Sequence, residues 1–240
     1  MKLTKFNIVS TLLIILVVLT MVGRLFNVPE LSNYAWITIF PFFAYLYYGQ
    51  AKQKNHFFGF FLLSFSIAEI LKIVFKGNQL LSYHCSNTLI IAAYLSLVIF
   101  LVKDINLRLL VKEFKLHLIV LTVFNTYIIY ALNQMIMQDE TLVVNTLDFA
   151  MEVTYNVLIL LVLSLSLVHY LYHETKHGLL LFLASVCIVF SEMVQVAYLF
   201  ISSEQLLQIT YSILMGIGFY FLYVYIKMKY LAIQKQAKLA

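Results

Sequence analysis

Charged residues are scarce in this 240-residue chain: Asp, Glu, Lys and Arg together make up 11% of it. That is less than half the usual share in soluble proteins, and it is too small to cover a water-facing surface. The scarcity excludes a soluble globular protein. The formal net charge of +5 does not indicate nucleic-acid binding, because the basic residues lie at the ends of apolar runs, where lipid headgroups account for them.

Cysteine and proline are equally rare, with two residues each. Cys85 and Cys187 fall in or beside apolar runs, and without a CxxC pattern or a Cys/His cluster they support neither a disulfide framework nor a zinc site. We therefore expect no metal and no cofactor. No stretch rich in Gly, Ser or Pro divides the chain, so residues 1–240 are predicted to form a single integral membrane domain.

Apolar residues make up 63% of the chain and are gathered into long continuous runs. About 20 apolar residues at ~1.5 Å each match a hydrocarbon core of ~30 Å. Continuous runs, as opposed to short alternating segments, exclude a β-barrel. The sequence therefore predicts an all-α, polytopic bundle of eight transmembrane spans, at about 7–26, 34–50, 56–76, 86–102, 116–137, 153–172, 178–201 and 206–226.

The distribution of basic residues predicts the orientation of this bundle. With the N-terminus inside, 13 of the 16 Lys and Arg residues fall on the cytoplasmic side, and Arg24, Lys72 and Lys76 fall on the other. The connections at 138–152 and 202–205 contain acidic residues but no Lys or Arg. We therefore expect both termini in the cytoplasm and an integral protein of a bacterial inner (cytoplasmic) membrane.

Two acidic residues, Glu69 and Glu192, lie inside apolar runs, in the third and seventh spans. A carboxylate at membrane depth costs a few kcal/mol on insertion scales, so each is a candidate functional residue. Both lie ~20 Å from the cytoplasmic edge when counted at ~1.5 Å per residue. We expect the third and seventh spans to be neighbours, with both carboxyls facing one interior cavity.

Other polar residues are expected at about the same depth: Ser66, Tyr155, Asn156, Ser191, Gln195, Thr210 and Tyr211. A structural explanation remains open for both acids. Lys72 follows Glu69 by three residues, so the two can form an intrahelical ion pair. Glu192 can equally well bind a neighbouring helix through a hydrogen bond.

Several further residues have a simple structural interpretation. Asn125 is expected to hydrogen-bond a neighbouring helix, and Gly216 and Gly218 to let the last span approach another closely. A cluster of ring side chains near a cytoplasmic end is interpreted as interfacial and not as a metal site: His169, Tyr170, Tyr172, His173 and His177.

Four short motifs occur in order along the spans. The second span contains ITIFPFFAYLYY and the third contains SIAE, which ends at Glu69. The seventh contains FSE, which ends at Glu192, and the eighth contains QITYSILMG, with Thr210 and Tyr211 at its centre. The set resembles the motifs of the YhhN-like family of eight-span membrane proteins, whose characterised animal members are lysoplasmalogenases.

The departures from that family pattern are specific. The family has Lys-Pro in span two, where this chain keeps Pro41 but has Phe40 for the lysine. Its Gly-Asp and Ser-Asp become Ala-Glu and Ser-Glu, so both acids remain carboxylates with one more methylene. The glutamine that follows Thr-Tyr in span eight is Met215 here.

The resemblance implies hydrolysis of the vinyl-ether bond of a lysolipid in the membrane. Glu69 and Glu192 would be the acid/base pair, and Tyr211 would orient the water or the headgroup. The other polar residues at that depth are candidates for substrate binding: Ser66, Asn156, Ser191, Gln195 and Thr210. Two alternatives remain: a proton-coupled small-molecule carrier, and a lipid-binding or structural membrane protein without catalysis.

Overall fold

The computed structural model describes residues 2–50, 55–75, 77–105, 112–137 and 146–239. Within these ranges every regular element is an α-helix, and no strand occurs. Six helices are long and apolar enough to cross a membrane, which confirms the predicted helical membrane bundle. The helices are α1 (Lys2–Leu25), α2 (Pro29–Gln50), α3 (His56–Val74), α4 (Gln79–Lys103), α6 (Lys115–Ile136), α8 (Thr146–His173), α9 (Lys176–Phe200) and α10 (Gln205–Leu239).

The six apolar helices are α3, α4, α6, α8, α9 and α10. In α1 the apolar part found among the described residues is shorter, Thr11–Leu25. Helix α2 is less apolar because it carries Glu, Asn, Gln, Trp and four Tyr residues, yet its 22 residues extend over ~33 Å. It continues through Pro41.

Side-chain caps define where three of the helices begin. The Asn55 side chain accepts hydrogen bonds from the backbone N–H groups of Phe57 and Phe58 at the start of α3. Asn78 and Thr175 cap α4 and α9 in the same way. Such caps satisfy backbone donors that have no partner inside the helix. The caps therefore begin each helix at a defined residue of a short polar connection.

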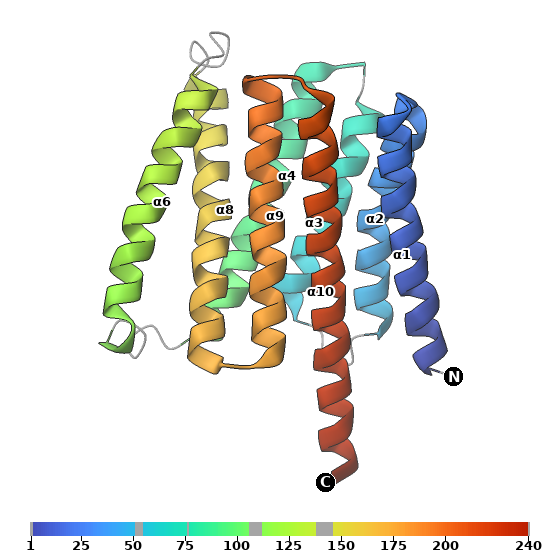
Figure 1. Cartoon of the computed structure of the whole chain (residues 1–240), viewed down its shortest axis with the longest axis vertical. Helices are drawn as coiled ribbons and strands as arrows, with labels where there is room; N and C mark the ends of the chain where they lie inside the picture. The colour runs from blue at the N-terminus through green and yellow to red at the C-terminus, as the bar shows by residue number, and fades with distance from the viewer. Residues whose placement is uncertain (1, 51–54, 76, 106–111, 138–145, 240) are drawn as a thin grey trace.

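Seven of the helices form a closed ring, visible in Figure 1 as a bundle of nearly parallel rods. Neighbours around the ring are α1, α2, α3, α4, α8, α9 and α10, and α10 packs back on α1. Helix α6 lies outside the ring against α8 and α9. Its buried residues among those described are Ile128, Leu132 and Ile136, so most of its surface is left for lipid.

Aromatic side chains fill the interior of this ring. Phe40 of α2 contacts Phe65 of α3 and Phe219 of α10, with ring centroids 4.9 Å apart in both pairs. Phe65 in turn meets Tyr94 of α4 edge to face at 6.0 Å. All four side chains are almost wholly buried. Helices on opposite sides of the ring are thus joined through aromatic contacts, which stabilise beyond the area that they bury.

The two glycines of the last span allow the close approach that the sequence predicts. A Cβ at Gly218 would lie 2.7 Å from Cγ1 of Ile188 and 3.2 Å from the carbonyl oxygen of Ala184, both on α9. A Cβ at Gly216 would lie 3.0 Å from the Val17 side chain of α1. Helix α10 therefore depends on glycine where it meets its two neighbours.

Both chain ends lie at the same end of the bundle, and the last turns of α10 extend beyond it (Figure 1). We call this end the terminal face and the opposite end the distal face. Glu69 and Glu192 both lie nearer the distal face, as their positions late in α3 and α9 require. Some charges that enter the orientation argument are outside the described residues: Lys52, Lys54, Lys76, Arg108, Asp139 and Glu140.

Candidate functional site

Glu69 is held in the interior by one donor from a neighbouring helix and one from its own. The Trp36 indole Nε1 of α2 donates to Oε2 at 3.2 Å. Lys72 Nζ lies 2.6 Å from Oε1, which confirms the predicted intrahelical ion pair. The Glu69 side chain is 7% exposed and that of Lys72 is 38% exposed, so the ammonium group reaches toward the distal face.

Glu192 is buried, and its neighbours are neutral hydroxyls. Tyr94 of α4 donates to Oε1 at 2.5 Å. The Tyr155 hydroxyl of α8 lies near the same carboxyl. The Tyr94 donor comes from another helix, so it confirms the predicted interhelical hydrogen bond and fixes the carboxyl inside the ring.

The two carboxyls belong to one electrostatic cluster although their helices are not neighbours. Glu192 lies within electrostatic range of both Glu69 and Lys72. However, α3 packs on α2 and α4, whereas α9 packs on α8 and α10. The expectation that the two helices pack side by side is therefore wrong. Phe65 of α3 instead packs on Phe40, Tyr94 and Phe219 of α2, α4 and α10.

Arg24 adds a second cation to this cluster, and unlike Lys72 it is buried. Its guanidinium carbon lies 4.5 Å from the ring centroid of Tyr211 and 5.2 Å from that of Trp36. Nη1 donates to the carbonyl oxygen of Gln208 at 2.6 Å. Nε is buried and has no hydrogen-bond partner among the described residues. The residue is 6% exposed.

Three of the predicted substrate-binding hydroxyls donate to backbone carbonyls. Ser66 and Thr210 bond the carbonyl oxygens four residues earlier in their own helices, at 2.6 and 2.8 Å. Ser191 donates to the carbonyl oxygen of Tyr211 at 2.6 Å and so joins α9 to α10. The hydroxyl protons of these three residues are therefore engaged in structural hydrogen bonds to the backbone.

The two predicted amides differ in their surroundings. Asn156 of α8 is fully buried, and neither polar atom of its side chain has a hydrogen-bond partner among the described residues. It stands one residue from Tyr155, which lies near Glu192. Gln195 is partly buried one turn beyond Glu192. A buried amide without partners is costly, so Asn156 is available for hydrogen bonds with a guest molecule.

A second group of polar side chains joins α4 to α8 nearer the distal face. The Tyr83 hydroxyl donates to Glu152 Oε1 at 2.6 Å, and Asn87 Nδ2 lies 3.4 Å from the same oxygen. His84 Nδ1 lies 3.5 Å from Asp148 Oδ1. Acidic residues of the predicted outer connection are thus partly folded into the helix pair.

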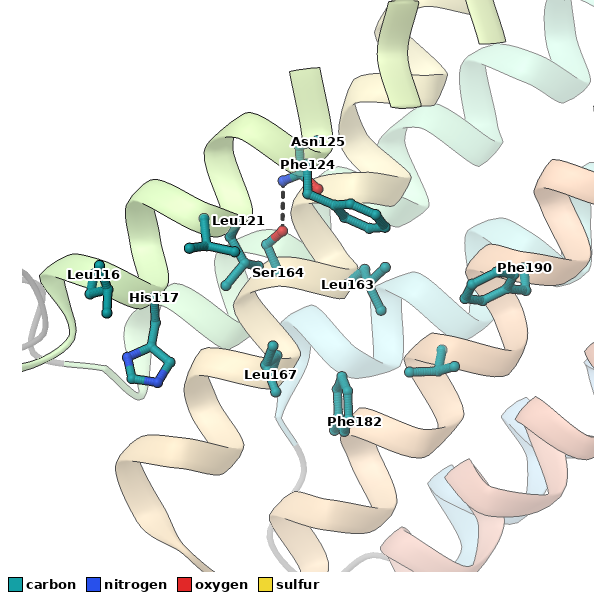
Figure 2. Close-up of a pocket in the computed structure, with 12 residues that line it drawn as sticks. Leu116, His117, Leu121, Phe124, Asn125, Leu163, Ser164, Leu167, Phe182 and Phe190 are labelled. Atoms are coloured by element: carbon teal, nitrogen blue, oxygen red, sulfur yellow. Dashed lines mark hydrogen bonds between the residues drawn. The ribbon is translucent and has the colours of Figure 1, made fainter. Parts of the chain in front are cut away.

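The described pocket lies away from both glutamates. It has a volume of about 490 Å³ and is formed by α6, α8 and α9 (Figure 2). Leu163, Phe182 and Phe190 line it, together with other apolar side chains. Phe190 and Glu192 lie on different faces of α9, because two residues correspond to about 200° around a helix. This pocket between α6, α8 and α9 is therefore not the cavity that we expected the two carboxyls to share.

Two further interpretations from the sequence can be compared with the structure. Asn125 of α6 donates from Nδ2 to Ser164 Oγ of α8 at 2.6 Å, which confirms the predicted interhelical bond (Figure 2). His169 of that ring cluster is buried, and its Nε2 lies 3.7 Å from Asp104 Oδ2. Among the described residues no group of three or more His, Cys, Asp or Glu could hold a metal ion.

Sequence reasoning missed Trp36, Tyr94 and Arg24 as members of this cluster. For Arg24 a signal was present, because it is one of the three basic residues on the side that the charge distribution leaves nearly free of them. A basic residue in such a place needs an anion or a buried aromatic partner. Trp36 is the only tryptophan of the chain, but nothing in its sequence position indicates a contact with Glu69, and no signal distinguishes Tyr94 from the other 16 tyrosines.

Comparison of the chain with protein-family models, with curated proteins and with solved structures gives no match. The assignment of a function therefore depends on the geometry of the site.

Proposed function

We propose that this protein is a membrane-embedded hydrolase that cleaves the vinyl-ether bond of a lysolipid, with Glu69 and Glu192 as its acid/base pair. The observation that carries the proposal is the pair itself. Two buried carboxyls lie within electrostatic range of one another inside an aromatic-lined ring of helices. Carboxyls in such places are expensive, and they are retained where proton transfer is needed.

The different surroundings of the two acids assign their roles. Lys72 places a positive charge 2.6 Å from Glu69, which favours a carboxylate there. Glu192 lies near neutral hydroxyls of Tyr94 and Tyr155 in a fully buried position, which suits a carboxylic acid. Two titratable groups with opposite environments are typical of acid/base catalysis. Glu192 is therefore the general acid and Glu69 the general base.

The reaction follows from these roles. Glu192 donates its proton to the outer carbon of the C=C–O group, and the ether carbon becomes an oxocarbenium ion. Water adds to that carbon while Glu69 accepts a proton from the water. The resulting hemiacetal collapses to a fatty aldehyde and a glycerophospho-base: Glu69 returns its proton to the departing glycerol oxygen, and the hemiacetal hydroxyl gives its proton to the Glu192 carboxylate, which restores the acid. The net reaction consumes one water and needs no metal or redox partner.

Both acids lie at a depth that such a substrate can reach from the distal face. Counted from the distal ends of their helices at 1.5 Å per residue, Glu69 lies ~7 Å deep and Glu192 ~12 Å deep, whereas counting from the terminal ends reverses this order. The two carboxyls therefore lie at about one depth. A lysolipid that enters from the distal leaflet with its chain inward would bring its vinyl-ether bond to that level.

The proposed topology is eight spans with both termini in the cytoplasm of a bacterial cell. It is supported by eight helices among the described residues, by two termini at one end of the bundle and by the 13-to-3 distribution of Lys and Arg. The distal face is then the outer face of the inner membrane. The single alkyl chain of the substrate would reach the site laterally from that leaflet.

The test is release of fatty aldehyde from a vinyl-ether lysolipid by the purified protein in detergent. Glu192→Gln preserves shape and hydrogen bonding but removes the transferable proton, so activity should fall on the order of 10²–10⁴-fold. Glu69→Gln should behave alike, and the double variant should be little worse than either, because the pair acts as a unit. The matched control is Glu152→Gln, a buried glutamate bound by Tyr83 outside the pair, which should retain activity.

Two results would contradict the proposal. One is wild-type protein that releases no aldehyde above background from any vinyl-ether lysolipid. The other is wild-type activity in Glu192→Gln. Because the Glu69–Lys72 pair also fits a purely structural role, activity that survives in Glu69→Gln would limit catalysis to Glu192 and remove the acid/base pair. A lipid-binding membrane protein without catalysis would then account best for the cluster.

A further inference from the structure

The buried guanidinium of Arg24 lies close to the proposed catalytic pair without a carboxylate partner of its own. Among the described residues no carboxylate oxygen lies within 4.0 Å of this guanidinium. The ion pairs found there are formed by Lys72, His84 and His169 and do not include Arg24. Nη1 donates to the Gln208 carbonyl and the guanidinium lies over the Tyr211 ring, whereas Nε has no hydrogen-bond partner in the part of the chain that the structure describes. A buried cation that lacks an anion is costly, so an anionic ligand would be stabilised beside it.

We propose that Arg24 binds the phosphate of a single-chain phospholipid whose glycerol portion lies at the Glu69–Glu192 pair. This inference deepens the proposed function and rests on it for the protonation of Glu192. With Glu192 neutral, the cluster contains two cations, Arg24 and Lys72, and one carboxylate, Glu69. The net charge is +1, which the single negative charge of a phosphodiester neutralises.

The spacing of the groups fits the glycerol portion of such a lipid. Trp36 connects the cation to the base, because its ring lies 5.2 Å from the Arg24 guanidinium carbon and its N–H donates to Glu69. The two charged groups are therefore separated by about one indole ring. In a lysolipid the phosphate and the ether oxygen are separated by a three-carbon glycerol, so both can be contacted at once.

The depth of Arg24 agrees with this placement. It is the penultimate residue of α1, at the distal end of the helix, whereas Glu69 and Glu192 lie deeper. The phosphate, the ether bond and the alkyl chain would thus follow one another from the distal face inward. Arginine suits the outer position because its planar fork of donors matches a phosphate, and the Tyr211 ring would hold that fork in orientation.

The experiment measures binding and does not depend on hydrolysis. The full chain is purified in a non-ionic maltoside, and ligand affinity is obtained from the rise in thermal midpoint with concentration. Lysophosphatidylcholine, which has an acyl ester and no vinyl ether, is compared with a monoacylglycerol of the same chain length and with glycerophosphocholine. We expect lysophosphatidylcholine to bind at least tenfold more tightly than either of the others.

Arg24→Gln should remove most of that preference, with a loss of about tenfold or more for lysophosphatidylcholine and little change for monoacylglycerol. Arg24→Lys retains the charge but not the fork and should give an intermediate loss. Lys103→Met is the matched control, because Lys103 also lies over an aromatic ring, that of Phe57 at 4.0 Å, but at the terminal face. Its affinities should equal those of the wild type.

Three results would overturn the inference. Equal binding of lysophosphatidylcholine and monoacylglycerol by the wild type would remove the phosphate site, and this comparison needs no variant to fold. A preference that persists in Arg24→Gln would place the phosphate elsewhere. Equal stabilisation by glycerophosphocholine would show that the bound phosphate need not belong to a lipid. If the lipid preference depends on Arg24 but no aldehyde is released in the catalytic assay, the hydrolase proposal falls and the phosphate site stands.

Discussion

At the scale of the residue, each membrane-embedded carboxyl is held by a donor from a helix other than its own. Trp36 lies 33 residues before Glu69, and Tyr94 lies 98 residues before Glu192. Both donors have large apolar rings that pack in the interior while their polar tips satisfy the acids. The same side chains therefore stabilise the ring of helices and orient the charged groups.

The first prediction concerns the hydroxyl that faces Glu192. Tyr94→Phe keeps the ring contacts of Tyr94 but removes the donor 2.5 Å from the carboxyl. The free energy of unfolding should fall by about 1–2 kcal/mol, because a buried acceptor loses a partner. Thermal or denaturant unfolding in detergent measures the change. Tyr45→Phe is the control, since Tyr45 is 74% exposed, and it should be neutral; an equal loss in both variants would contradict the argument.

The depths of the acids could be predicted from the sequence, whereas their partners could not. Counting residues at a fixed rise places Glu69 and Glu192 near one level, and the i,i+3 spacing predicts Lys72 as a partner. Which of many tyrosines meets Glu192 depends on the packing of α4 against the ring, and no local pattern encodes that. The unpartnered amide of Asn156 is likewise visible only once its neighbours are placed.

At the scale of the element, the apolar runs locate each helix, but for some helices the run covers only the apolar part and misses polar turns at the ends. The run 178–201 and α9 (Lys176–Phe200) agree closely. The run 86–102 falls short of α4 (Gln79–Lys103), because the first turns of α4 carry polar side chains such as Tyr83 and His84, which contact Glu152 and Asp148. The period of hydrophobic residues cannot report such turns, whereas the Asn78 cap does indicate where the helix begins.

A second prediction concerns the contact between α9 and α10. Gly218→Ala would place a methyl group 2.7 Å from Ile188 Cγ1 and 3.2 Å from the Ala184 carbonyl oxygen, so α10 must move away from α9. We expect a loss of about 1–3 kcal/mol in unfolding free energy. Gly49→Ala is the control, because no atom lies within 4 Å of the new methyl, and it should be neutral or slightly stabilising. Equal stability of both variants would show that the two helices are not closely packed there.

At the scale of the whole molecule, the ring closes because α10 returns to α1 and leaves α6 outside. The helical character of the bundle follows from the sequence, since long apolar runs in a bilayer must be helical. The order of helices around the ring does not, because every apolar face is compatible with lipid as well as with protein. This is why the third and seventh spans could be predicted at one depth and yet be wrongly expected to touch.

The last prediction concerns how this ring lies in the membrane. Helix α9 has 25 residues and spans ~37 Å, so its two ends should lie on opposite sides of a bilayer. In a variant without Cys85 and Cys187, Ser203→Cys marks the distal end of α9 and Glu174→Cys the terminal end; both positions are exposed. A membrane-impermeant maleimide added to intact cells should label Ser203→Cys, and it should label Glu174→Cys only after the membrane is opened. A reporter fused after Ala240 should be active in the cytoplasm, because α10 ends at the same face as Glu174.

Reversed labelling would place the termini outside against the distribution of basic residues, and labelling of both positions from one side would mean that α9 does not cross. Either result would also move the carboxyl pair away from the leaflet from which the lysolipid is proposed to enter.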